Sequence, residues 1–128
     1  MESFYKYLLN SREQEISIPE NLEERLNTVN KIKQKYPDRV PVVICKSKNE
    51  KTLKDIEQTR YLVPKKVNIV DLLVVIRKKL DVTKHQAIFI FAGNSLIPMN
   101  TTMEEVYNQY HNGDGILYIF YSLENTFG

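Results

Sequence analysis

Residues 60–80 read RYLVPKKVNIVDLLVVIRKKL, a segment that predicts a short strand followed by a helix. Asn68 can accept a backbone N–H bond at a helix start, and Asp71 adds a carboxylate near the positive end of the helix dipole. We therefore expect the helix to begin at Ile69. Because Pro64 has no N–H to donate, the preceding strand is expected at the edge of a sheet.

The helical part of this segment is more apolar than one buried face requires. Five apolar residues share one face at 100° per residue: Ile69, Leu72, Leu73, Ile76 and Leu80. Asp71 and Lys78 are expected on the opposite face of the helix, away from the core. Leu72 also joins Val75 and the stem of Lys79 in a flank that needs a partner, either the fold itself or a ligand. An edge strand beside such a flank predicts a groove for an extended peptide. The alternative is that this strand and helix pack into an ordinary core.

The rest of the chain predicts an α+β fold. Apolar residues at helical spacing indicate an amphipathic helix over residues 19–35 that Pro37 ends: Leu22, Leu26, Val29, Ile32 and Tyr36. Further strands are expected at 40–45, 87–91 and 116–121, a turn at 93–94 and a short helix at 102–110, with a polar connection at 46–58. Aromatic and leucine residues within 1–18 indicate another short helix. This order is that of a β-grasp, with the central helix on one face of the sheet and the N-terminal helices on the other.

Composition sets the broad class. The chain has 128 residues, 42% hydrophobic and 27% charged, as in one soluble domain. The longest apolar run is too short to span a bilayer, no secretory signal is evident, and one cysteine offers no internal disulfide, so we expect a reducing cytosol. The net charge is +2, but residues 46–84 hold eleven lysines and arginines against five acids. That basic region predicts either a solvated face or a surface for an acidic partner.

Little in the sequence predicts chemistry. Cys45, His85 and His111 are far apart, and no local pattern joins them as nucleophile and base or as metal ligands. No Gly-rich phosphate loop or nucleic-acid-binding motif is recognised. We therefore expect no enzyme activity, no cofactor, no metal site and no nucleic-acid partner. Gly128 offers an unhindered carboxylate that suits acyl transfer through thioesters.

Five segments resemble one protein family: KYPDRVPVVI at 35–44, RYLVP at 60–64, VIRKKL at 75–80, AIFIF at 87–91 and YSLENTFG at 121–128. Together they resemble the ubiquitin-like autophagy modifiers, the autophagy-related protein eight family with its GABARAP-type members. The resemblance implies one domain, 1–128, with an N-terminal extension of two helices at 1–36, a β-grasp core at 39–121 and a flexible conjugation tail at 122–128. It also implies that Gly128 is joined to phosphatidylethanolamine.

The resemblance implies partners as well. An activating (E1-like) and a conjugating (E2-like) enzyme would carry Gly128 as thioesters, and a cysteine protease would expose it and later release it from lipid. The protein would be a monomer in the cytoplasm and a peripheral, lipid-anchored protein on autophagosomal membranes after conjugation. It would recruit cargo receptors that carry an aromatic-x-x-aliphatic motif.

The family's motif-binding positions map onto two pockets beside the 60–64 strand. The first pocket is matched by Ile32, Pro41, Val43, Arg60, Leu62 and Ile116. The second is matched by Ile44, Tyr61, Val63, Pro64, Val67, Leu72 and Val75. Arg39 and Lys79 match basic positions that receive acidic groups around the motif.

Some residues depart from the family pattern. Thr28 replaces a frequent acid, Gln58-Thr59 replaces part of a lysine run, Leu72 replaces a common Phe, and the 46–58 loop is one residue longer. These departures bear on receptor selectivity. The alternative function is a non-conjugated ubiquitin-like interaction module that keeps the groove alone, and the fate of Gly128 distinguishes the two.

Overall fold

The computed structural model describes residues 18–57 and 59–123. The helix expected within residues 1–18 and the tail expected to be flexible fall almost wholly outside this part of the chain. Eight elements follow in order: α2 (Leu22–Lys35), β1 (Arg39–Lys46), β2 (Arg60–Pro64), α3 (Ile69–Leu80), β3 (Phe89–Ala92), β4 (Ser95–Leu96), α4 (Met103–Tyr110) and β5 (Leu117–Ser122). The α+β order predicted from the sequence is confirmed.

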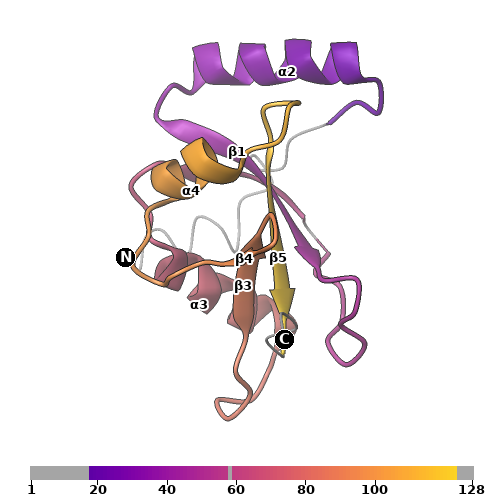
Figure 1. Ribbon diagram of the computed structural model, residues 1–128, viewed down its shortest axis with the longest axis vertical. Coiled ribbons are helices and arrows are strands. Elements are labelled where there is room, and N and C mark those ends of the chain that lie inside the picture. The colour runs from indigo at the N-terminus through magenta and orange to yellow at the C-terminus, as the bar shows by residue number, and fades with distance from the viewer. Residues whose placement is uncertain (1–17, 58, 124–128) are drawn as a thin grey trace.

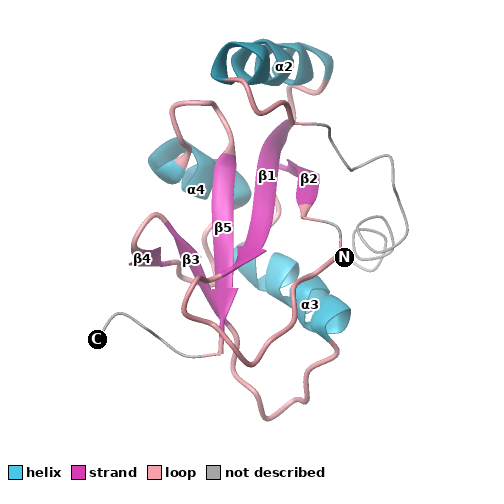
Figure 2. Cartoon of the chain, turned by 90° about the vertical axis from the view of Figure 1, so that its right-hand side faces the viewer, coloured by secondary structure: helices cyan, strands magenta, loops and turns pink. Residues whose placement is uncertain are grey.

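The strands form one mixed sheet in the order β2-β1-β5-β3-β4 (Figures 1 and 2; all five strands are labelled in Figure 2). β1 and β5 are parallel, from Val42↔Leu117 to Lys46↔Tyr121, and the other neighbouring pairs are antiparallel. Among the described strands, β2 pairs with β1 alone and lies at one edge of the sheet (Figure 2). The prediction that Pro64 marks an edge strand is therefore confirmed.

α3 begins at Ile69, as the sequence predicts, and the Asn68 backbone N–H donates to the Asp71 carboxylate at 3.3 Å. One expectation for this helix is wrong. Asp71 was expected opposite the core, but it is buried. The burial follows from its capping role, because its carboxylate turns back toward the backbone at the helix start and satisfies an N–H there.

The β3 region differs from the prediction in its bounds. β3 begins two residues later than the expected 87–91 strand, and the Gly93-Asn94 turn joins it to β4, with Ala92 opposite Ser95. Gly93 has φ +60°, the left-handed conformation that glycine adopts at low cost. β4 has only two residues, too few for an alternating pattern, which is why the sequence did not indicate it.

Alternation along the strands creates two apolar clusters on opposite faces of the sheet. The main core joins β1 residues Val42 and Ile44 to α3 and α4. The smaller cluster contains Val29 of α2 with Val43 and Ile116. α2 crosses one end of the sheet (Figures 1 and 2) rather than covering its whole face, so the two-sided cover expected from the sequence is only partly formed by the described residues.

The connection between β1 and β2 is not simply polar, as its composition suggested. Leu53 and Ile56 are buried in the main core. Glu50 is buried too, at 7% exposure, and its carboxylate accepts four hydrogen bonds, from Thr52 N, Leu53 N, Leu123 N and the Ser122 hydroxyl. Burial alone would raise the pKa of Glu50, but these bonds outweigh it and hold the pKa below its usual value.

Replacing Glu50 by Gln should lower the free energy of unfolding by about 1–3 kcal/mol at neutral pH, because the amide satisfies fewer of the four donors. Since the folded-state pKa is depressed, the stabilisation is fully present above the unfolded-state pKa of about 4.3 and is lost as the pH falls through the folded-state pKa. Urea denaturation of both proteins at decreasing pH measures this. Glu57→Gln, an exposed carboxylate of the same loop, should stay within about 0.5 kcal/mol of wild type. A Glu50→Gln deficit that did not change with pH would contradict the assignment.

Candidate functional site

The first set of predicted site residues lies on the α2 side of the sheet. Pro41 is opposite Leu62 and Val43 is opposite Arg60 in the β1–β2 register, so these four side chains share one face. Val43 and Ile116 contact Val29 of α2. Ile32, half-buried, lies one helical turn beyond Val29. The fold thus brings this set together beside the edge strand.

Polar contacts fix α2 against this cluster. The Arg25 guanidinium Nε lies 3.4 Å from the Asp114 carboxylate, which also accepts bonds from Ile116 N at 2.9 Å and the Tyr118 hydroxyl at 2.8 Å. Burial and the bond to Asp114 raise the pKa of Tyr118 to about 12, so its hydroxyl remains a donor at neutral pH. These contacts hold the helix that contributes Ile32 to the first predicted set.

A glycine allows α2 to approach this closely. Gly115 has φ +82°, and a Cβ at that position would lie 2.8 Å from Val29 Cγ1. Any larger residue would meet both backbone strain and steric overlap. The close approach of α2 to the sheet beside the first predicted set therefore depends on Gly115.

The second set of predicted residues lies in the main core. Six of its members are buried: Ile44, Tyr61, Val63, Val67, Leu72 and Val75. Pro64 is half-buried and, by strand alternation, belongs to the opposite face of β2. Leu72 is 0% and Val75 2% exposed, so the fold covers the flank for which the sequence left a ligand or the core as alternatives.

Basic side chains lie close to both ends of β2. Arg39 is opposite Pro64 in the β1–β2 register. Lys79 Nζ lies 5.8 Å from the centroid of the Tyr61 ring, and burial lowers its pKa. The exposed Arg60 begins the strand. An acidic peptide along this edge would meet positive charge at either end.

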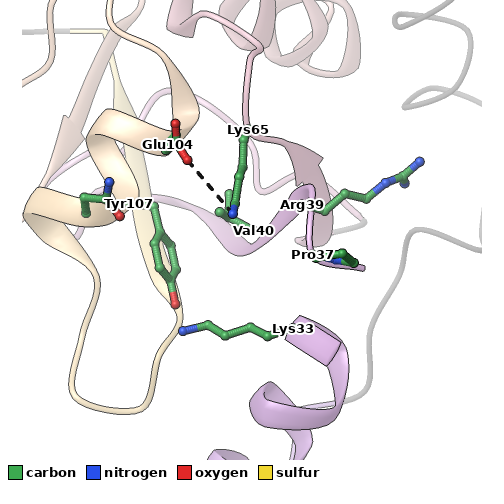
Figure 3. Close-up of a pocket in the computed structure, with 8 residues that line it drawn as sticks. Lys33, Pro37, Arg39, Val40, Lys65, Glu104 and Tyr107 are labelled. Carbon is green, nitrogen blue, oxygen red and sulfur yellow. Dashed lines mark ion pairs between the residues drawn. The ribbon is translucent and has the colours of Figure 1, made fainter. Parts of the chain in front are cut away.

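A pocket of about 370 Å³ adjoins the site near Arg39. Its lining residues are Lys33, Pro37, Arg39, Val40, Lys65, Glu104, Tyr107 and Asn108 (Figure 3). Lys65 Nζ lies 4.0 Å from Glu104 Oε2, and Lys33 Nζ lies 5.1 Å from the centroid of the Tyr107 ring. The sequence did not indicate this pocket, because its walls come from three separate segments with no shared motif.

The candidates for chemistry lie apart. Cys45 is half-buried; burial and then Asp55 raise the pKa of its thiol, while Arg60 partly lowers it. His85 is exposed, and the His111 ring stacks on the Tyr107 ring with the two centroids 4.9 Å apart. Within residues 18–57 and 59–123, no group of three His, Cys, Asp or Glu side chains is arranged to hold a metal ion. In the same part of the chain, no helix has the length and apolar character needed to cross a bilayer. Gly128, the predicted conjugation residue, lies outside the described residues.

Comparisons with a family model and with known proteins point to the same protein family. A family model described as "Autophagy protein Atg8 ubiquitin like" matches residues 24–128. Autophagy-related protein 8a of Arabidopsis thaliana is 38% identical over 107 residues, 84% of this chain and 87% of the relative. Autophagy-related protein 8 of Pichia angusta is 41% identical over 106 residues, 83% of this chain and 84% of the relative.

A solved structure of similar fold carries the name of the same protein family. The crystal structure of ATG8 from Trypanosoma brucei superposes with a TM-score of 0.73 at 25% sequence identity, covering 88% of this chain and 94% of that one. The ubiquitin-like α+β fold that the resemblance implied is confirmed.

Leu72→Ala should lower the free energy of unfolding by about 2–5 kcal/mol, because it removes a fully buried side chain and leaves a cavity in the main core. Thermal or urea unfolding measures the loss. Val70→Ala, at an exposed apolar position of the same helix, serves as the control and should change little. A Leu72→Ala protein as stable as wild type would show that Leu72 lines an open groove instead.

Proposed function

The chain belongs to the Atg8 family of ubiquitin-like autophagy proteins, and we propose that it acts as a covalent modifier whose Gly128 is joined to phosphatidylethanolamine. The observation that carries this proposal is that the family match extends through the YSLENTFG segment to Gly128. The protein is then the substrate of conjugation, not an enzyme. Its role is to mark a membrane and recruit proteins to it.

The chemistry assigns a role to each partner. The activating enzyme joins the Gly128 carboxylate to its cysteine as a thioester with cleavage of a nucleoside triphosphate, whose phosphate takes the carboxylate oxygen, and the thioester then passes to a cysteine of the conjugating enzyme. The lipid amine attacks the thioester carbonyl, the amide C–N bond forms, the C–S bond breaks, the cysteine thiolate leaves and the amine loses a proton. A cysteine protease hydrolyses the peptide bond after Gly128 where residues follow it, and later the amide to lipid.

Conjugation moves the protein from cytoplasm to the autophagosomal membrane. The lipid supplies two acyl chains, whereas a single chain gives only marginal, reversible attachment. The ubiquitin-like body need not change its fold to be anchored in this way.

We further propose that an aromatic-x-x-aliphatic peptide of a cargo receptor adds as a strand to the free edge of β2. Its aromatic residue would enter the first pocket, between α2 and the sheet, and Arg39, Arg60 and Lys79 would attract acids around the motif. With both anchors near the upper end of about 1.5–3 kcal/mol each and three strand hydrogen bonds near the upper end of about 0.5–1.5 kcal/mol each, the gross gain is about 10 kcal/mol, and peptide ordering reduces it to about 7–9 kcal/mol. That corresponds to a micromolar dissociation constant.

The aliphatic anchor requires a local rearrangement. The second set of residues is buried, so those side chains must separate to admit another apolar group. Such opening costs free energy and lowers the affinity. The substitution of Leu72 for the family's common Phe changes the volume at this place and gives a physical basis for a distinct receptor preference.

Deleting Gly128 should abolish the lipid-sized mass increase in a reconstitution with activating enzyme, conjugating enzyme and phosphatidylethanolamine vesicles. Thermal stability should stay within about 0.5 kcal/mol of the full chain, because the core built by residues 18–57 and 59–123 keeps all its side chains. In vesicle flotation without the enzymes, both proteins should remain mostly unbound. Lipidation of the truncated chain would show that Gly128 is not the acceptor, and strong flotation of unmodified protein would point to residues 46–84 as a membrane surface.

Arg60→Glu should weaken binding of an acidic-flanked aromatic-x-x-aliphatic peptide about fivefold at low salt, as expected from loss of about 1 kcal/mol at an exposed charge. The salt dependence of binding should also decrease, because screening then has less attraction to remove. Titration calorimetry at low and high salt measures both effects. Lys48→Glu makes the same charge change away from β2 and should bind nearly as wild type. Equal effects of the two variants would place the peptide elsewhere.

A further inference from the structure

We propose that Glu50 is a positioning residue for the conjugation reaction, fixing the root of the tail at Leu123 so that Gly128 is presented from a defined point of the body. This inference rests on the proposed conjugation at Gly128 and names a residue outside the tail that serves it. It is carried by the bonds of one buried carboxylate.

The two oxygens of Glu50 have separate tasks. Oε2 accepts from Thr52 N at 2.8 Å and Leu53 N at 2.9 Å, both within the loop. Oε1 accepts from Leu123 N at 2.8 Å and the Ser122 hydroxyl at 3.1 Å, more than 70 residues away in sequence. One oxygen fixes the carboxylate to its own loop, and the other holds the end of β5.

Leu123 lies beyond the reach of the sheet. The last described partners of β5 are Phe89, opposite Ser122, and Lys46, opposite Tyr121. Its N–H is therefore held by a side chain where the strand ladder has ended. Charge-assisted bonds to a buried carboxylate are stronger than bonds between neutral groups, so this contact can fix the position of Leu123 beyond the end of β5.

The loop has a second tie that does not involve the tail. The Tyr121 hydroxyl donates to Lys54 O at 2.8 Å and accepts from Ile56 N at 3.2 Å. Leu53 and Ile56 also bury their side chains in the core. The Tyr121 hydroxyl thus already fastens the loop to β5. Of these contacts, the Glu50 carboxylate alone holds the Leu123 amide.

The position of the root matters because the tail is short. Gly128 is five residues beyond Leu123, and at 3.3–3.6 Å per residue these reach about 18 Å at most. Release of Ser122 and Leu123 would lengthen the tether to seven residues and lower the effective concentration of Gly128 at a docked catalytic cysteine about 1.7-fold by the −3/2 power of length. Loss of a fixed direction adds to this, because oriented delivery contributes to transfer rates.

The test compares Glu50→Gln with two matched variants. Tyr121→Phe removes the other tie of the loop to β5 and keeps the Leu123 contact, and Glu57→Gln makes the same charge change at an exposed position of the loop. Ser122→Ala, which removes one of the two bonds on the tail side, gives a milder version of the same change. Two quantities are measured on full-length proteins: hydrogen exchange of the Leu123 amide by NMR, and single-turnover transfer from the conjugating-enzyme thioester to phosphatidylethanolamine vesicles.

Glu50→Gln should speed Leu123 exchange about tenfold or more, as for loss of a bond of roughly 1.5 kcal/mol, and slow transfer about two- to fivefold at saturating protein concentration. The concentration for half-maximal rate should not change, because the docking surface is intact. Ser122→Ala should show smaller changes of the same kind. Tyr121→Phe and Glu57→Gln should transfer at the wild-type rate.

The outcomes separate the two claims. If wild type forms no lipid adduct, the proposed function fails and this inference fails with it. If wild type is lipidated but Glu50→Gln transfers equally fast or faster, only the positioning role is overturned. Equal slowing in Tyr121→Phe would also overturn it, because that result would mean a general effect of loop stability.

Discussion

The parallel pairing of β1 with β5 is the contact on which the rest of the structure depends. It places strands from opposite halves of the chain at the centre of the sheet, with β2 outside β1 and β3 outside β5. Because β1 is apolar on both faces, Val42 and Ile44 reach the main core while Val43 reaches the α2 cluster. The edge position of β2, the wall formed by α2 and the exit of the tail all follow from this central pair.

Local signals in the sequence predicted local structure well. The Asn68 cap, Pro64 at an edge strand and the Gly93-Asn94 turn each act through backbone geometry within a few residues, so their effect is visible in sequence. Apolar periodicity likewise located α3 and the end of α2, although α2 begins three residues later than expected, and the short helix expected at 102–110 matches α4 within one residue. The family resemblance assigned residues to two predicted pockets, an assignment that spacing alone did not suggest.

Features that depend on distant partners were not predictable in this way. A polar loop gave no sign that Leu53 and Ile56 enter the core or that Glu50 bonds to residues more than 70 positions away. The spacing of 100° per residue predicts Asp71 opposite the core, because it considers only where the Cα lies on the helix. It does not include the bend of a capping side chain back toward the backbone. The pocket beside Arg39 has walls from three segments, and sequence order contains no information about their meeting.

β5 is the last element of the described chain, yet it lies between β1 and β3. During synthesis, the sheet can therefore not close until residues 117–122 have been made, and β1 would wait with one edge unpaired. Such non-local pairing is slow to form and leaves apolar faces exposed meanwhile, which favours aggregation or chaperone binding. A ribosome stalled before residue 117 would carry a chain that lacks its central strand. The order of translation thus brings completion of the sheet and synthesis of residues 123–128 close together in time.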